Sequence, residues 1–129
     1  MWIAFTIVAF SLLNIGLAKI DATLIFNSKR IKHGINGLVY ISILAVPYFV
    51  FHNYWLVAVL LFDRLLFFNL FLSYFRGVGW LYMPLKPDAI SDKIAKFIFG
   101  TKGLLMYVTY GVIFIALSLW VLLNPHPLQ

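Results

Sequence analysis

YWLVAVLLFDRLLFFNLFLSYF, residues 54–75, is the stretch that decides the fold class. It is almost wholly apolar, and roughly 20 apolar residues in a helix are enough to cross the hydrocarbon core of a bilayer. Two ionisable side chains, Asp63 and Arg64, stand next to each other near its middle. An unshielded charge at the bilayer centre costs at least about 2.5–3.5 kcal/mol on insertion scales. This pair therefore needs shelter, and it marks the first place to look for function.

The composition of the whole chain agrees with a membrane setting. Of its 129 residues, 64% are hydrophobic and 11% are charged, whereas charged residues make up about a quarter of a soluble domain. The chain has no cysteine, which excludes disulfides, thiolate metal sites and a cysteine nucleophile. We expect an all-α integral membrane protein, a single transmembrane domain over residues 1–129.

Four segments are long and apolar enough to be spans: about 2–20, 35–52, 54–75 and 103–123. Only His52 and Asn53 separate the second span from the third, which predicts an antiparallel hairpin. Before the fourth span, residues 89–99 carry one apolar stripe, formed by Ile90, Ile94, Phe97 and Ile98. The sequence therefore predicts a four-helix bundle with a short amphipathic interfacial helix before the fourth transmembrane helix.

The basic residues predict an orientation. Nine of the ten fall in residues 19–34 and 76–102, and the tenth is Arg64. By the positive-inside rule both stretches are cytoplasmic and both termini lie outside, as in a bacterial inner membrane protein. The net charge of +6 would favour a nucleic-acid partner in a soluble protein, but here it follows the membrane pattern and predicts none.

The basic loops are expected to contact anionic lipid headgroups, at about 1 kcal/mol per basic residue near the surface. The residues expected to do so are Lys29, Arg30, Lys32, Lys93 and Lys96. A phosphate or nucleotide site in the first loop is the alternative, but no glycine-rich cradle accompanies it. The stripe of residues 89–99 could also pack against the ends of the bundle.

Every span offers a hydrogen-bonding group at a similar depth, estimated at about 1.5 Å per residue. We predict a mid-bilayer polar site for a ligand or an ion, formed by Asp63, Arg64, Asn14, Asn69, Ser42, Tyr40 and Thr109. Neighbouring helical residues point about 100° apart, so Asp63 and Arg64 are expected to face different gaps between helices. One of them could instead cross to a second copy of the chain, and Arg64 could stack on an aromatic ring.

These residues favour a small membrane protein that binds or translocates a ligand, an ion or a proton. The alternative is a non-catalytic accessory, assembly or immunity-type protein whose intramembrane charges pair with a partner helix or only fix helix register. An enzyme acting on lipid through residues 76–102 is a weaker alternative. No paired carboxylates, catalytic triad, metal-ligand cluster or cofactor motif is present, so we predict no catalytic residue, metal or cofactor.

Overall fold

The computed structural model describes residues 1–27, 33–82 and 90–125, and all regular structure in these ranges is helical. The helices are α1 (Trp2–Phe26), α2 (His33–Phe51), α3 (Tyr54–Asp63), α4 (Asn69–Phe75), α5 (Ile90–Phe99) and α6 (Gly103–Leu123). A π-helical turn, η1 (Arg64–Phe68), joins α3 to α4, so Tyr54–Phe75 is one continuous rod. The first helix extends past the predicted end at residue 20, to Phe26.

Three helices have the length and hydropathy to cross a membrane: Trp2–Phe26, Tyr54–Phe75 and Gly103–Leu123. Large apolar side chains remain exposed along them, among them Phe5 at 65%, Leu12 at 65% and Val112 at 62%. Water would disfavour so much apolar surface, whereas lipid does not. The three helices therefore indicate a membrane protein. The described apolar part of α2, Gly37–Phe51, is shorter than these three.

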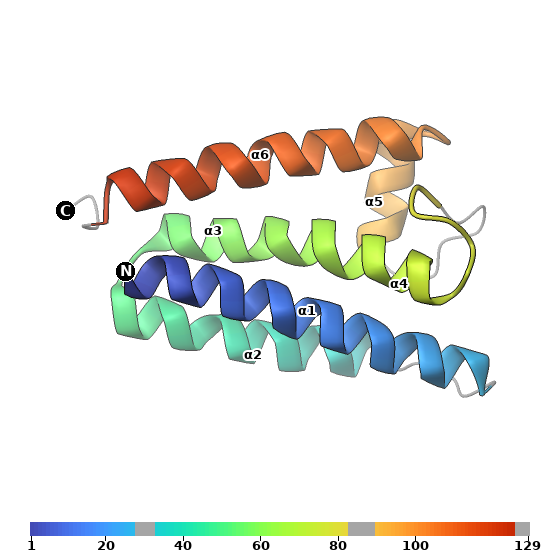
Figure 1. Ribbon diagram of the computed structural model, residues 1–129, viewed down its shortest axis with the longest axis horizontal. Helices are drawn as coiled ribbons and strands as arrows, with labels where there is room; N and C mark the ends of the chain where they lie inside the picture. The colour runs from blue at the N-terminus through green and yellow to red at the C-terminus, as the bar shows by residue number, and fades with distance from the viewer. Residues whose placement is uncertain (28–32, 83–89, 126–129) are drawn as a thin grey trace.

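The long helices run side by side and alternate in direction (Figure 1). Helix α1 packs along α3, η1 and α4, while α6 and α2 each pack against α3. The start of α1 and the end of α6 lie at one end of the molecule (Figure 1). We call this the terminal end, and the opposite end, where α4 finishes and α6 begins, the loop end.

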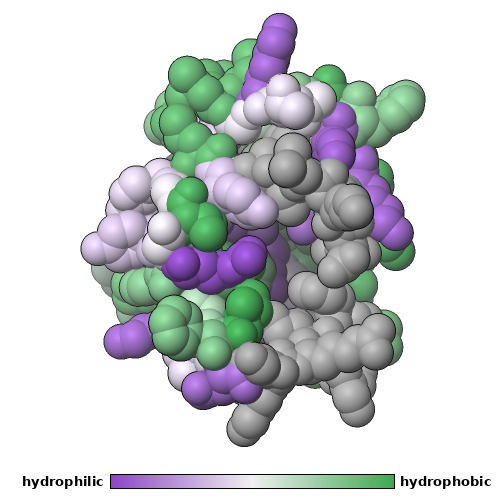
Figure 2. All heavy atoms as spheres, turned by 90° about the vertical axis from the view of Figure 1, so that its right-hand side faces the viewer, coloured by the Kyte–Doolittle hydropathy of each residue, from purple (hydrophilic) through white to green (hydrophobic). Residues whose placement is uncertain are grey.

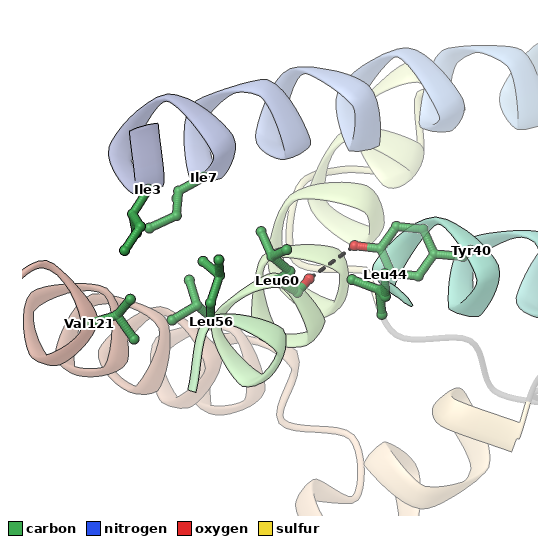
Figure 3. Packing of buried hydrophobic residues seen from close by; sticks show 8 residues of the cluster. Ile3, Ile7, Tyr40, Leu44, Leu56, Leu60 and Val121 are labelled. Carbon is green, nitrogen blue, oxygen red and sulfur yellow. Dashed lines mark hydrogen bonds between the residues drawn. The ribbon is translucent and has the colours of Figure 1, made fainter. Parts of the chain in front are cut away.

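The core is centred on α3 near the terminal end. Leu56, Val59 and Leu60 are fully buried there, and they meet side chains from the three neighbouring long helices. Figure 3 shows this cluster, which consists of Ile3, Ile7, Tyr40, Leu44, Leu56, Val59, Leu60 and Val121. The same cluster contains the Tyr40 hydroxyl, which donates to the Leu60 carbonyl at 2.9 Å. Apolar packing and this buried hydrogen bond thus join α2 to α3 in the core.

A tight turn joins α2 to α3, as the two intervening polar residues predicted. His52 has a left-handed backbone with φ 49°. Asn53 then caps α3, because its side-chain oxygen accepts from the Leu56 N–H at 3.1 Å. Asparagine is among the favoured N-cap residues, since it satisfies an N–H group that the first helical turn leaves open.

Glycines with left-handed backbones shape the loop end. Gly77 and Gly79 follow α4 with φ of 69° and 94°, and Gly100 follows α5 with φ of 62°. Such values suit glycine, which has no Cβ to clash. Gly100 comes directly after α5, which spans Ile90–Phe99, close to the predicted helix over residues 89–99. Helix α5 runs across the loop end, crosswise to the long helices (Figure 1).

Candidate functional site

Asp63 lies at the end of α3 and is fully buried. Its Oδ1 accepts a hydrogen bond from the Ser11 hydroxyl of α1 at 3.1 Å. Its Oδ2 is also buried, and no residue in the described ranges donates to it. A buried carboxylate oxygen without a donor is costly in a low-dielectric interior. Asp63 therefore has an open acceptor that faces protein and not lipid.

Arg64 follows directly but takes other partners. Its Nη1 donates to the Asn14 Oδ1 of α1 at 3.3 Å. Its Cζ lies 3.4 Å from the centroid of the Phe68 ring and 4.8 Å from that of the Tyr40 ring. Cation–π contacts of this kind gain strength where water is excluded. The guanidinium is thus sandwiched between α1, α2 and its own helix, although Arg64 as a whole is only half-buried.

Asn14 connects the three helices. It is fully buried, and while its Oδ1 accepts from Arg64, its Nδ2 donates to the Tyr40 hydroxyl at 3.3 Å. The Tyr40 hydroxyl in turn donates to the Leu60 carbonyl. One continuous network therefore runs from Arg64 through Asn14 and Tyr40 back to α3. Buried networks of this type fix the position of each member when every group is satisfied.

Ser11 and Asn14 belong to one seam of α1. The seam continues toward the loop end with Ala18, Asp21 and Ala22, all buried. Residues three and four apart share a face of a helix, so the partners of Asp63 and of Arg64 lie on the same side of α1. We had expected the two charges to face different gaps, but both make their hydrogen bonds to this helix.

The π-helical turn begins at Arg64, directly after Asp63. Beyond the turn, the Asn69 backbone N–H bonds the Leu66 carbonyl, and the Asn69 side chain donates to the Leu65 carbonyl at 2.9 Å. In a regular α-helix the Asn69 backbone N–H would donate to the Leu65 carbonyl. Here that N–H bonds Leu66 instead, and the Asn69 side chain donates to the Leu65 carbonyl in its place. π-turns inside α-helices occur frequently at functional sites. Asn69 stabilises this one from its far end.

The structure places three of the predicted site residues outside this network: Asn69, whose side chain bonds the Leu65 carbonyl of its own rod, together with Ser42 and Thr109. The Ser42 hydroxyl donates to the Leu38 carbonyl at 2.9 Å, and the Thr109 hydroxyl donates to the Leu105 carbonyl at 2.8 Å. Both are bonds to the preceding turn of the same helix, which is the usual way for serine and threonine to satisfy themselves in apolar surroundings. Ser42 and Thr109 were predicted because they lie at the same estimated depth as Asp63. Their side chains point to other sides of their helices and do not contact it. Ser11, which the prediction left out, takes their place.

Of the predicted lipid-contacting residues, Lys93 and Lys96 lie on α5, and Lys93 is exposed. Lys29, Arg30 and Lys32 lie outside the described residues. The apolar stripe of α5 points away from the bundle, since Phe97 is 91% exposed, while the opposite residue Ala95 is buried against α6. The helix thus packs through Ala95 and Phe99 and leaves the side chains of its apolar stripe exposed.

A second polar region lies at the loop end, on another side of the same rod. A half-open cavity of about 50 Å³ is enclosed there by α4, α5 and α6. Asn69, Ser73 and Arg76 line it from the rod, and Asp92 and Tyr107 face them. Within the described ranges no three histidine, aspartate or glutamate side chains come together as a metal site.

Comparisons of the chain with protein-family models, with curated proteins and with solved structures found no match.

Proposed function

We propose that the chain is a four-span membrane protein whose polar layer around Asp63 and Arg64 binds or translocates a small ion or a proton. In this proposal α2 is the remaining span. It runs antiparallel to α3 (Figure 1) and joins α3 through a two-residue turn. At about 1.5 Å per residue its length comes close to the thickness of the hydrocarbon core.

The orientation is part of the proposal. Helices α4, α5 and α6 bring Arg76, Lys93, Lys96 and Lys102 to the loop end (Figure 1). An excess of lysine and arginine favours the cytoplasmic side. The loop end would then be cytoplasmic and both termini would lie outside, as in a bacterial inner membrane.

The open acceptor on Asp63 is the observation that carries the proposed activity. An ionisable residue in a span is a functional candidate because burying it is costly. One oxygen of the Asp63 carboxylate accepts a hydrogen bond from Ser11, and the second oxygen meets no donor in the described ranges. A proton or a small cation on that oxygen would offset this cost. Side chains of α1, α2 and α3 pack closely around the layer, which favours a small occupant over a bulky solute.

Arg64 would supply a fixed positive charge beside the acceptor. Because Asn14, Tyr40 and Phe68 hold it, it cannot collapse onto Asp63 without breaking these contacts. Pro47 lies in α2 two turns from Tyr40, and proline removes one backbone hydrogen bond from a helix. Bending of α2 at Pro47 would open the Tyr40 side of the layer and admit the ion.

Reconstitution into liposomes tests the proposal. Proton flux, driven by a diffusion potential and read with an entrapped pH-sensitive dye, and potassium flux, read with an entrapped potassium-sensitive dye, are compared between the wild type and Asp63→Asn. The matched control is Asp92→Asn, the same chemical change at the loop end. We expect the flux to be lost in Asp63→Asn and retained in Asp92→Asn, with unchanged helix content in both. Equal flux in Asp63→Asn and wild-type vesicles would exclude the proposal.

A second candidate function rests on the half-burial of Arg64. A guanidinium has five N–H donors, and the described residues give it one hydrogen bond. A helix of a partner membrane protein, or a second copy of the chain, could accept from the others, as in an accessory, assembly or immunity-type protein. Light scattering on the detergent-purified protein tests this. An oligomer that dissociates on Arg64→Gln, with flux absent from the wild type, would favour the partner role.

A further inference from the structure

The cavity at the loop end is a separate site, built by residues that make none of the hydrogen bonds to Asp63 or Arg64. Asn69, Ser73 and Arg76 follow one another at spacings of four and three along α4 and so form one stripe. Asp92 of α5 and Tyr107 of α6 form the facing walls. The cavity of about 50 Å³ exceeds the roughly 10–15 Å³ needed to hold one water molecule. It can therefore hold a small polar group.

The walls suit a group that carries both signs of charge. Arg76 offers a planar fork of N–H donors, the side-chain type that best matches phosphate oxygens. Its Cζ lies 5.7 Å from the centroid of the Tyr82 ring, and such a face contact leaves the in-plane N–H groups available. Asp92 has an interaction of its own, but a carboxylate has about four acceptor positions. It can therefore also accept from an ammonium group.

Hydroxyl and amide groups complete the polar lining. Ser73 and Tyr107 are both buried, and their side chains line the cavity together with those of Asn69 and Tyr82. Hydroxyl hydrogens rotate to suit an acceptor, so these groups can donate to oxygens of a phosphate held by Arg76. The Asp92 carboxylate would repel an anion without a compensating cation. The lining as a whole therefore matches a phosphate that bears a neighbouring amine.

The surroundings put the cavity at the depth of lipid headgroups. Helix α5, which forms one wall, carries its apolar stripe on the outside, where Ile90, Ile94, Phe97 and Ile98 are all exposed. Trp80 stacks on Tyr74 at the same end, with ring centroids 4.3 Å apart. Exposed apolar stripes and tryptophan or tyrosine side chains are typical of the membrane–water interface. Figure 2, which looks onto this end, shows hydrophilic residues lying between hydrophobic patches.

We infer that the cavity between α4, α5 and α6 binds the headgroup of a zwitterionic phospholipid, with Arg76 on the phosphate and Asp92 on the amine. The acyl chains would lie along the apolar outer faces of α5 and α6. Binding there would join α5 to the long helices through a lipid and would be independent of ion binding at Asp63.

Native mass spectrometry of the detergent-purified chain tests the inference with three probes. These are short-chain phosphatidylethanolamine, short-chain phosphatidylglycerol and inorganic phosphate. Wild-type protein should bind phosphatidylethanolamine most tightly. Arg76→Gln should weaken that binding about tenfold, the loss expected when a charge-assisted hydrogen bond is removed. The matched control, Lys102→Gln, removes a positive charge from an exposed residue at the same end and should change the affinity little.

Two further variants make the test decisive. Asp92→Asn should lower the preference for phosphatidylethanolamine over phosphatidylglycerol, because it removes the repulsion of an anionic headgroup. Arg76→Lys keeps the positive charge but lacks the planar fork of guanidinium N–H donors. It is used in place of Arg76→Gln if the glutamine variant does not fold. Equal losses for Arg76→Gln and Lys102→Gln would overturn the inference, since nonspecific attraction would then explain the binding. If inorganic phosphate bound as tightly as the lipid, the cavity would be a site for free phosphate and not for a lipid headgroup.

Discussion

One helical rod, Tyr54–Phe75, carries two polar regions that are built in opposite ways. At its middle, Asp63 and Arg64 meet side chains from α1 and α2 that fill the space around them. At its end, Ser73 and Arg76 line a half-open cavity. Hydrocarbon offers no hydrogen bonds, so polar groups deep in a span must find partners within the protein. Near the interface, water and lipid headgroups can supply them. In the proposed placement, depth in the membrane would explain why one region is filled and the other is hollow.

The largest difference between the two regions should appear on removing the amide that links the helices. Asn14→Leu leaves the Arg64 guanidinium and the Tyr40 hydroxyl without their shared partner. Stranding a buried charged group costs about 3 kcal/mol of unfolding free energy. Unfolding in mixed detergent micelles, followed by circular dichroism, measures this change. The control is Asn27→Leu, at an exposed asparagine beyond α1, and a similar loss in both variants would contradict the comparison.

The same substitution in both regions gives a direct contrast. Ser11→Ala removes the hydroxyl that donates to the buried Asp63, and hydrogen bonds to charged groups contribute about 1.5–3 kcal/mol. Ser73→Ala removes a hydroxyl that bonds Tyr107 on the wall of the cavity, where water can take over this bond, and we expect a loss of less than about 0.5 kcal/mol. Equal losses in the same micellar titration would mean that depth does not set the cost.

A smaller effect is expected for the two tyrosine hydroxyls of α2. Tyr40→Phe removes a buried hydroxyl that joins Asn14 to the Leu60 carbonyl. It should cost about 0.6–1.7 kcal/mol, the range found for hydrogen bonds between membrane helices. Tyr48→Phe removes an exposed bond to the Tyr54 hydroxyl and should have almost no effect on the unfolding midpoint. A larger loss for Tyr48→Phe than for Tyr40→Phe would place the supporting network elsewhere.

Hydropathy and depth explain how much of this arrangement the sequence could predict. Apolar length identified the three long helices, and the turn at His52 and Asn53 followed from their polarity. Asn14 and Tyr40 entered the predicted site because they share a depth with Arg64. The same argument would have found Ser11, which by residue rise lies about as far from its helix start as Asp63 does from its own.

Other features depend on information that depth does not contain. Ser42 and Thr109 lie at a suitable depth, but the angle around a helix decides whether a side chain faces a neighbour, and several spans are apolar on all sides. The π-helical turn at Arg64–Phe68 contains no proline or glycine from which it could have been predicted. The cavity required α5 to be placed against α4 and α6, and these contacts join residues far apart in the sequence.

Lipid accessibility along the rod tests the central claim, that the chain shelters its intramembrane charges. Because the chain has no cysteine, single substitutions such as Leu61→Cys and Asp63→Cys each carry one nitroxide label for paramagnetic resonance in bilayers. Leu61 is 44% exposed and Asp63 is 0% exposed, so oxygen dissolved in the lipid should relax the label at position 61 strongly and the label at position 63 weakly. Equal oxygen accessibility at both positions would place Asp63 against the acyl chains and contradict the account.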